Sequence, residues 1–284
     1  MSLQRVFIFV QIGMLLVFSL LPLPVFAEDT NWNRVFTKQV HDWIDNLSSK
    51  DEQFKEWKDA KTNIQALGPN SRQWLVTLQV RNKPVGYLIV EEDRKTDPQS
   101  DMPSFILLEY GLGEYILFNE STQPKQFPGQ PVYDGFASFW KISQNGTTQY
   151  VDAKTGEQYP TIVKPDNPVM STLAKTDLAQ AGLALTRHTS LGTTLTDPFD
   201  QIDWMFATPV SAQNTEITWQ DLWKTTDQEA VVVTASLFQD EVMAPFTVGS
   251  LHVWGENVAY IGVWDEGLRF LPSAYITKVG KIIH

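Results

Sequence analysis

The sequence predicts an α+β fold, with N-terminal helices packed on antiparallel sheet and a second mixed unit rich in antiparallel strands. Three observations support this class. Apolar residues recur at helical spacing over residues 32–47. From residue 74 onward the period changes to the alternation typical of strands. Asn145-Gly146 lies between two expected strands, at residues 136–143 and 147–151, which is a strong signal for a β-hairpin.

The first 27 residues have the three parts of a secretory signal peptide. Arg5 supplies the positive start, residues 6–21 form a nearly unbroken apolar run, and Val-Phe-Ala at 25–27 suits cleavage before Glu28. The apolar run has 16 residues, fewer than the roughly 20 that a membrane-spanning helix needs. We therefore expect a secreted or cell-surface protein with no membrane span after cleavage. The alternative is an uncleaved N-terminal anchor.

Residues 28–160 are expected to form the first unit, a helix plus antiparallel sheet domain. The apolar stripe predicts a helix at residues 32–47. Ser49 and Glu52 have the spacing of a capping box, which indicates a short second helix after them. Turns and loops then separate the strands expected at residues 74–80, 85–92, 105–110, 115–118, 136–143 and 147–151.

Residues 161–284 are expected to form a C-terminal α+β domain, because three prolines within residues 159–168 indicate a linker. Apolar spacing favours a helix over residues 171–185. After it we expect a threonine-rich loop at 189–198, a helical turn at 200–206, a short helix at 219–224, a buried strand at 230–237 and a hairpin at 251–254 and 258–264.

Composition excludes several classes of function. The formal charge is −11, and −12 once Arg5 leaves with the signal peptide, so we expect neither nucleic acid nor anionic lipid as a partner. The chain has no cysteine. Disulfides, thiol catalysis and cysteine-ligated metals are therefore excluded. A cysteine-free exported protein is typical of a Gram-positive bacterium.

Face parity in the closing hairpin predicts the candidate binding residues. If residues 255–257 form a three-residue turn, the aliphatic side chains share one face, which belongs in the core. The opposite face carries aromatic side chains with polar groups and could bind a sugar or peptide by stacking. The alternative is that residues 189–198 cover this face. The candidate binding residues are His252, Trp254, Tyr260 and Trp264.

No catalytic residue, cofactor or metal site is predicted. His252 and Asp265 could act as a general base and its orienting acid, but no nucleophile accompanies them. Gly-Leu-Gly at 111–113 lacks the third glycine of a nucleotide-binding loop. Glu109 and Glu114, which flank these glycines, are expected to be solvated.

Two short sequence segments resemble segments of PepSY-type domains, which are small helix-plus-antiparallel-sheet modules of bacterial propeptides and envelope proteins. They are Asn-Lys-Pro-Val-Gly-Tyr-Leu-Ile-Val at residues 82–90 and Tyr-Val-Asp-Ala-Lys-Thr-Gly-Glu at residues 150–157. The resemblance covers at most residues 32–160. It implies a protein that binds a peptide or restrains a peptidase, without catalysis.

A second comparison rests on the expected helix at 219–224, the buried strand at 230–237, Gly-Ser-Leu-His at 249–252 and a strand that reaches Asp265. This order resembles the histidine-bearing half of papain-like peptidases of the bacteriocin-processing type. The nucleophilic cysteine is missing, so this resemblance implies an inactive relative. We expect a non-enzymatic exported protein whose partner is a peptide, a peptidase or a cell-envelope component. The alternatives are the inactive relative, a hydrolase whose site no motif reveals, and a purely structural envelope subunit.

Overall fold

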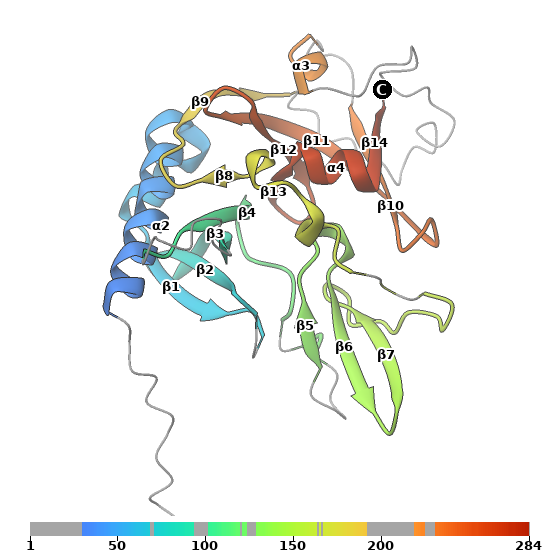
Figure 1. The fold of residues 1–284 in the computed structure, drawn as a ribbon. Helices are drawn as coiled ribbons and strands as arrows, with labels where there is room; N and C mark the ends of the chain where they lie inside the picture. The colour runs from blue at the N-terminus through green and yellow to red at the C-terminus, as the bar shows by residue number, and fades with distance from the viewer. Residues whose placement is uncertain are drawn as a thin grey trace, which may run out of the picture.

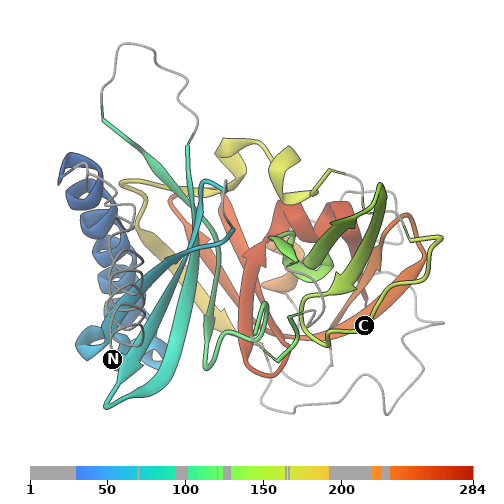
Figure 2. The ribbon, with the colours of Figure 1, turned by 90° about the horizontal axis from the view of Figure 1, so that it is seen from below.

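The computed structural model describes residues 30–68, 71–93, 102–119, 121–123, 129–163, 165, 167–191, 219–224 and 231–283 (Figure 1; Figure 2). The predicted signal peptide, the helical turn expected at 200–206 and most of the loop expected at 189–198 lie outside these residues. Antiparallel strands outweigh helices in the described part of the chain, so the α+β class is confirmed.

One antiparallel sheet takes strands from both halves of the chain. Its strands are β1 (Lys61–Ala66), β2 (Gln73–Val80), β3 (Lys83–Glu92), β4 (Phe105–Leu112), β8 (Ala179–Gln180), β9 (Leu185–Ser190), β10 (Val232–Leu237), β11 (Val242–Trp254), β12 (Val258–Trp264), β13 (Leu268–Pro272) and β14 (Gly280–Ile283). The hydrogen-bonded order is β1-β2-β3-β4-β13-β12-β11-β10-β14, with β8 beside β4 and β9 beside β11. This sheet is the frame on which the rest of the described chain is arranged.

A smaller sheet lies at the lower right of Figure 1 and contains β5 (Gln130–Val132), β6 (Phe139–Gln144) and β7 (Thr147–Asp152). Asn145 and Gly146 connect β6 to β7, and both have positive φ. Asparagine and glycine are the residues that tolerate this backbone conformation in a two-residue hairpin turn. The hairpin predicted from these two residues is therefore confirmed.

Helix α2 (Thr30–Lys50) and the 3₁₀ helix η1 (Glu52–Asp59) lie at the left of Figure 1. Phe36 of α2 stands edge-on to Trp74 of β2 and Phe105 of β4, with ring centroids 5.6 and 4.9 Å apart. The other helices in the described residues are η2 (Gly135–Ala137), η3 (Met170–Thr172), η4 (Lys175–Asp177), α3 (Trp219–Leu222) and α4 (Ser273–Val279). Within the described ranges, none of the helices has the length and apolarity that a membrane crossing requires.

Alternate residues of the strands enter two hydrophobic clusters. Leu88 and Val90 of β3 join the cluster that contains α2 and η1, whereas Tyr87 and Ile89 join the cluster that contains α4. Each cluster combines residues from before and after residue 160, and β4 pairs with β13 across that point. The described residues therefore do not pack as two units, 28–160 and 161–284, with separate cores.

The helix predicted at residues 171–185 is wrong. This segment forms η3, η4, β8 and the first residue of β9. A tertiary contact replaces helical hydrogen bonding, because the Ala179 backbone N–H donates to the Tyr260 hydroxyl at 3.1 Å. Residues 115–118 form no strand. Strand β1 was not predicted, because most of its side chains are exposed and show no alternation.

Candidate functional site

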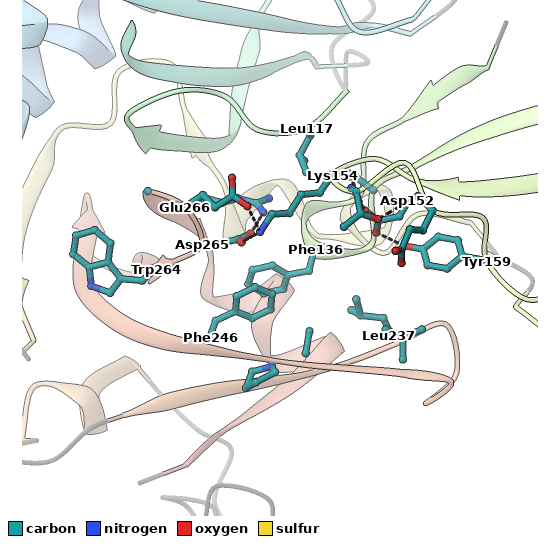
Figure 3. A pocket seen from close by; sticks show the side chains of 18 of the residues that line it. Leu117, Phe136, Asp152, Lys154, Tyr159, Leu237, Phe246, Trp264, Asp265 and Glu266 are labelled. Carbon is teal, nitrogen blue, oxygen red and sulfur yellow. Dashed lines mark hydrogen bonds and ion pairs between the residues drawn. The ribbon is translucent and has the colours of Figure 1, made fainter. Parts of the chain in front are cut away.

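A pocket of about 900 Å³ lies among the turn after β7, the β10–β11 hairpin and the β12–β13 turn (Figure 3). Ligand sites commonly measure about 300–1,000 Å³, so this volume suits several side chains of a peptide or one small molecule. The lining residues are Leu117, Phe136, Ser138, Asp152, Lys154, Thr155, Glu157, Gln158, Tyr159, Pro160, Leu237, Val242, Ala244, Pro245, Phe246, Thr247, Trp264, Asp265, Glu266, Gly267 and Arg269.

Aromatic and aliphatic side chains supply much of the pocket wall. Phe136 and Phe246 stack with ring centroids 4.1 Å apart and planes 10° apart. Tyr159 packs on Phe238 of the β10–β11 turn, with centroids 4.8 Å apart. A ligand that buries apolar surface against this wall gains the hydrophobic free energy of that burial.

Trp264 lines the pocket and keeps 38% of its surface exposed. Its indole lies against the bare backbone of Gly249, where a Cβ atom would come within 2.4 Å of the indole Nε1. Glycine at this position therefore leaves the space that the ring occupies.

A chain of five charged side chains runs from the core to the pocket. Glu109 on β4 and Arg269 on β13 are buried and form a two-point ion pair, 2.9 Å through Nε and 3.1 Å through Nη2. Arg269 Nη1 also donates to Asp265 at 2.6 Å. Lys154 Nζ then lies 2.5 Å from Asp265 and 3.1 Å from Glu266 (Figure 3). Each of the two basic groups in this series is thus paired with two carboxylates.

Strand register and one glycine position Glu109 and Arg269, the buried end of this series of charged side chains. Arg269 pairs with Gly111, two residues beyond Glu109. A Cβ atom at Gly111 would come within 2.7 Å of the Tyr87 ring, so glycine lets this ring lie over the strand. The hydroxyls of Tyr87 and Tyr133 donate to the two oxygens of Glu109 at 2.5 and 2.6 Å. The carboxylate is therefore satisfied, as a buried charge must be.

The ion pairs shift the pKa values of their members toward the charged forms. Burial is the largest single effect on the pKa of Arg269 and would lower it, but Glu109, Tyr87 and Asp265 together outweigh burial and the pKa is raised. Burial alone would raise the pKa of Asp265, but Arg269 and Lys154 outweigh it and the pKa is lowered. The pKa of Lys154 is raised by Asp265 and Glu266, against the effect of burial. These groups are held in their charged states rather than poised for proton transfer.

Asp152 organises the turn that presents Lys154 to the pocket. Its Oδ1 accepts hydrogen bonds from the backbone N–H groups of Lys154 and Thr155 at 2.8 and 2.7 Å. Its Oδ2 accepts the Tyr159 hydroxyl at 2.6 Å. Burial and this hydrogen bond raise the pKa of Tyr159, so the phenol remains a donor.

Asp134 fixes the segment that carries the pocket residue Phe136. Its carboxylate accepts the backbone N–H groups of Val169 at 3.0 Å and Met170 at 2.7 Å, and its carbonyl accepts the Tyr275 hydroxyl at 2.6 Å. Burial raises the pKa of Asp134 to about 6, although the two backbone hydrogen bonds act in the opposite direction.

The raised pKa of Asp134 predicts a pH dependence of stability. The ordinary pKa is 3.8 and the folded value is about 6, so the folded state binds this proton more tightly than the unfolded state. The resulting stabilisation is complete below pH 3.8 and is lost as the pH rises through about 6, a change of about 3 kcal/mol. Urea unfolding of the natural chain and of Asp134→Asn should show this change in their difference. A difference that is constant with pH would contradict the prediction.

The predicted hairpin register is confirmed, because His252 opposes Tyr260 and Trp254 opposes Val258. However, His252, Trp254 and Tyr260 are each 0% exposed. Their face packs within the cluster that contains α2 and η1, so these three side chains line no open groove. Among the four predicted binding residues, the structure places only Trp264 at the pocket.

The pair proposed between His252 and Asp265 does not form. His252 Nε2 lies 3.0 Å from Asp51 Oδ2, and its Nδ1 lies 2.9 Å from the Tyr110 hydroxyl, to which Trp254 donates at 3.2 Å. Burial lowers the pKa of His252, although Asp51 acts to raise it. His252 is therefore part of a buried hydrogen-bond network that ties η1 to the sheet.

Sequence reasoning did not single out Arg269 or Lys154, and it expected Glu109 to be solvated. Glu114 is exposed, but Glu109 is buried. A signal for Glu109 existed, since a carboxylate inside the apolar run 105–110 requires a charged partner if the strand is buried. That partner lies 160 residues away, beyond the reach of local patterns. In the described residues, no group of three or more histidine, aspartate or glutamate side chains is placed to hold a metal.

No protein-family model matches this chain, and no curated protein matches it with significant similarity. Its function is therefore inferred from the geometry of the pocket.

Proposed function

We propose that this chain is an exported, non-enzymatic protein that binds a peptide or a cell-envelope component in the pocket lined by Phe136, Lys154, Tyr159, Phe246 and Trp264. The observation that carries this proposal is the combination of an apolar wall with two basic groups, Lys154 and Arg269, that are already paired with carboxylates. Such a site offers apolar surface for binding, with the exposed carboxylates of Glu157 and Glu266 at its rim to orient a ligand.

The hydrolase alternative receives less support from the same pocket. Its serine, Ser138, donates its hydroxyl to the Gly135 carbonyl at 2.9 Å and accepts the Asp134 backbone N–H at 2.9 Å. A nucleophilic serine requires a base within hydrogen-bond reach. The inactive papain-like relative is also less supported, because His252 and Asp265 bind other partners.

We extend the proposal to a PepSY-like arrangement of residues 32–160, with helices on antiparallel sheet and a peptide-binding or peptidase-restraining role. The contacts of Phe36 with β2 and β4 support the arrangement. The string at residues 150–157 ends β7 and forms the pocket turn around Lys154. The string that suggested the resemblance therefore contributes directly to the proposed site.

Export and a Gram-positive source remain part of this proposal, supported by the N-terminal apolar run and the lack of cysteine. N-terminal sequencing of protein recovered from the medium should begin at Glu28. An intact Met1 in a washed membrane fraction would indicate a retained anchor instead.

Filling the pocket tests the binding role. Ala244 lines the pocket and is half-buried, whereas its neighbour Met243 is exposed and does not line it. We expect Ala244→Trp to weaken binding of the neutral apolar dye Nile red by about tenfold, equivalent to about 1.4 kcal/mol. Met243→Trp is the matched control and should bind the dye as the natural chain does. Equal dye binding by the natural chain and both variants, measured by fluorescence titration, would count against this pocket.

A further inference from the structure

We infer, resting on the proposed function, that the pocket selects an extended cationic amphipathic peptide, in which apolar side chains alternate with lysine or arginine. Three independent features of the pocket lead to this ligand: its excess of acidic groups, the aromatic side chains at its two ends, and a strand edge in its wall.

The first feature is charge. The pocket is lined by four acidic side chains and two basic ones. Both basic groups are already committed, because Lys154 bridges Asp265 and Glu266 while Arg269 also pairs with the buried Glu109. The side chains of Glu157 and Glu266 are exposed. The net negative potential at the rim therefore attracts a cation and disfavours an anion.

The second feature is the pair of aromatic residues at opposite ends of the pocket in Figure 3, Trp264 and Tyr159. An ammonium or guanidinium group over an aromatic face gains a cation–π interaction. Phe136 already shows this geometry with Arg269, whose guanidinium lies 5.6 Å from the ring centroid. Aromatic rings beside carboxylates suit a ligand that carries apolar and cationic groups close together.

The third feature is a strand edge, which favours a peptide over a compact small molecule. Four consecutive residues of β11, from Ala244 to Thr247, line the pocket. Successive side chains of a strand point to opposite faces, so the pocket reaches the edge of β11 as well as one face. Among the described strands, β10 alone pairs with β11 residues 242–247.

The backbone at this edge also limits which strand can add to it. The Val248 N–H donates to the Val231 carbonyl. The backbone N–H and C=O of one residue point to the same side of an antiparallel strand, and successive residues alternate between the two sides. Since Val248 faces β10, the carbonyl of Pro245, three residues earlier, faces away from β10. Proline provides an acceptor but no donor, which hinders continuous pairing between two copies. A short peptide that supplies one N–H here fits better than a second copy of this chain.

Two short peptides test the inference, both acetylated and amidated. One alternates leucine and tryptophan with lysine, and the other carries glutamate in place of lysine. We expect the mature protein to bind the lysine peptide at least about tenfold more tightly in calorimetry, with an affinity that falls when salt rises from about 0.05 to 0.5 M. The double variant Glu157→Gln with Glu266→Gln should bring the two affinities within about threefold of each other.

The control variant removes the same charge elsewhere. Glu56→Gln with Glu256→Gln changes two exposed glutamates that do not line the pocket, and it should keep the full preference. Equal affinity for both peptides, or loss of the preference in the control, would overturn the cationic ligand while leaving the binding role intact. A protein that binds neither of the two peptides and also does not bind Nile red would overturn both the inference and the proposed function.

Discussion

Replacing Arg269 with methionine is expected to lower the free energy of unfolding by about 3–5 kcal/mol. The substitution leaves Glu109 buried without its counter-charge, although the hydroxyls of Tyr87 and Tyr133 still donate to it. An uncompensated charge in the interior costs more than the pair itself contributes. Urea unfolding followed by tryptophan fluorescence measures the loss as a lower midpoint at unchanged slope.

A second variant distinguishes the effect of the unpaired Glu109 carboxylate from the effect of losing the packing of the Arg269 side chain. Glu109→Gln combined with Arg269→Met keeps an acceptor for a tyrosine hydroxyl and removes both charges, so it should recover part of the stability lost in Arg269→Met. A double variant as unstable as the single one would show that packing of the arginine side chain dominates. A loss below about 1 kcal/mol in Arg269→Met would mean that Glu109 is not confined in a dry interior.

Truncating Trp254 to alanine is expected to destabilise the protein by about 3–5 kcal/mol through lost apolar transfer energy and the cavity left behind. Trp254 is fully buried, and its indole Nε1 donates to the Tyr110 hydroxyl, which in turn bonds His252. Removing the indole therefore disturbs the network that also holds Asp51. Thermal or urea unfolding checks the expected loss.

Trp264→Ala is the matched comparison on the same hairpin. The Trp264 ring is partly exposed and lines the pocket, so its removal should cost about 1 kcal/mol or less and should weaken Nile red binding. Trp254→Ala should therefore mainly lower stability, whereas Trp264→Ala should mainly weaken binding. Equal destabilisation by both variants, or a Trp254→Ala protein with normal stability, would contradict the arrangement described here.

The alternation of side chains predicted the register of the β11–β12 hairpin and which side chains share a face, but it did not predict what packs against each face. Alternation placed Leu251 and Ile261 on one face and His252 with Tyr260 on the other, and the register agrees. Which face is open depends on what packs against it. Here the aromatic face belongs to the hydrophobic cluster that also contains residues of α2 and η1, and Asp51, which His252 contacts, is 201 residues away in the sequence.

By itself, the sequence determined features whose cause is local: the helix starting near residue 32, the Asn145-Gly146 turn, the parity of the hairpin, and the exclusion of cysteine chemistry. Tertiary structure alone decided that β4 pairs with β13, and this pairing brings Glu109 and Arg269 together across 160 residues. It also assembled the pocket from three turns distant in sequence. Periodicity and turn chemistry report each segment's own backbone preference, whereas the burial of a face and the partner of a charge depend on which distant surface meets it.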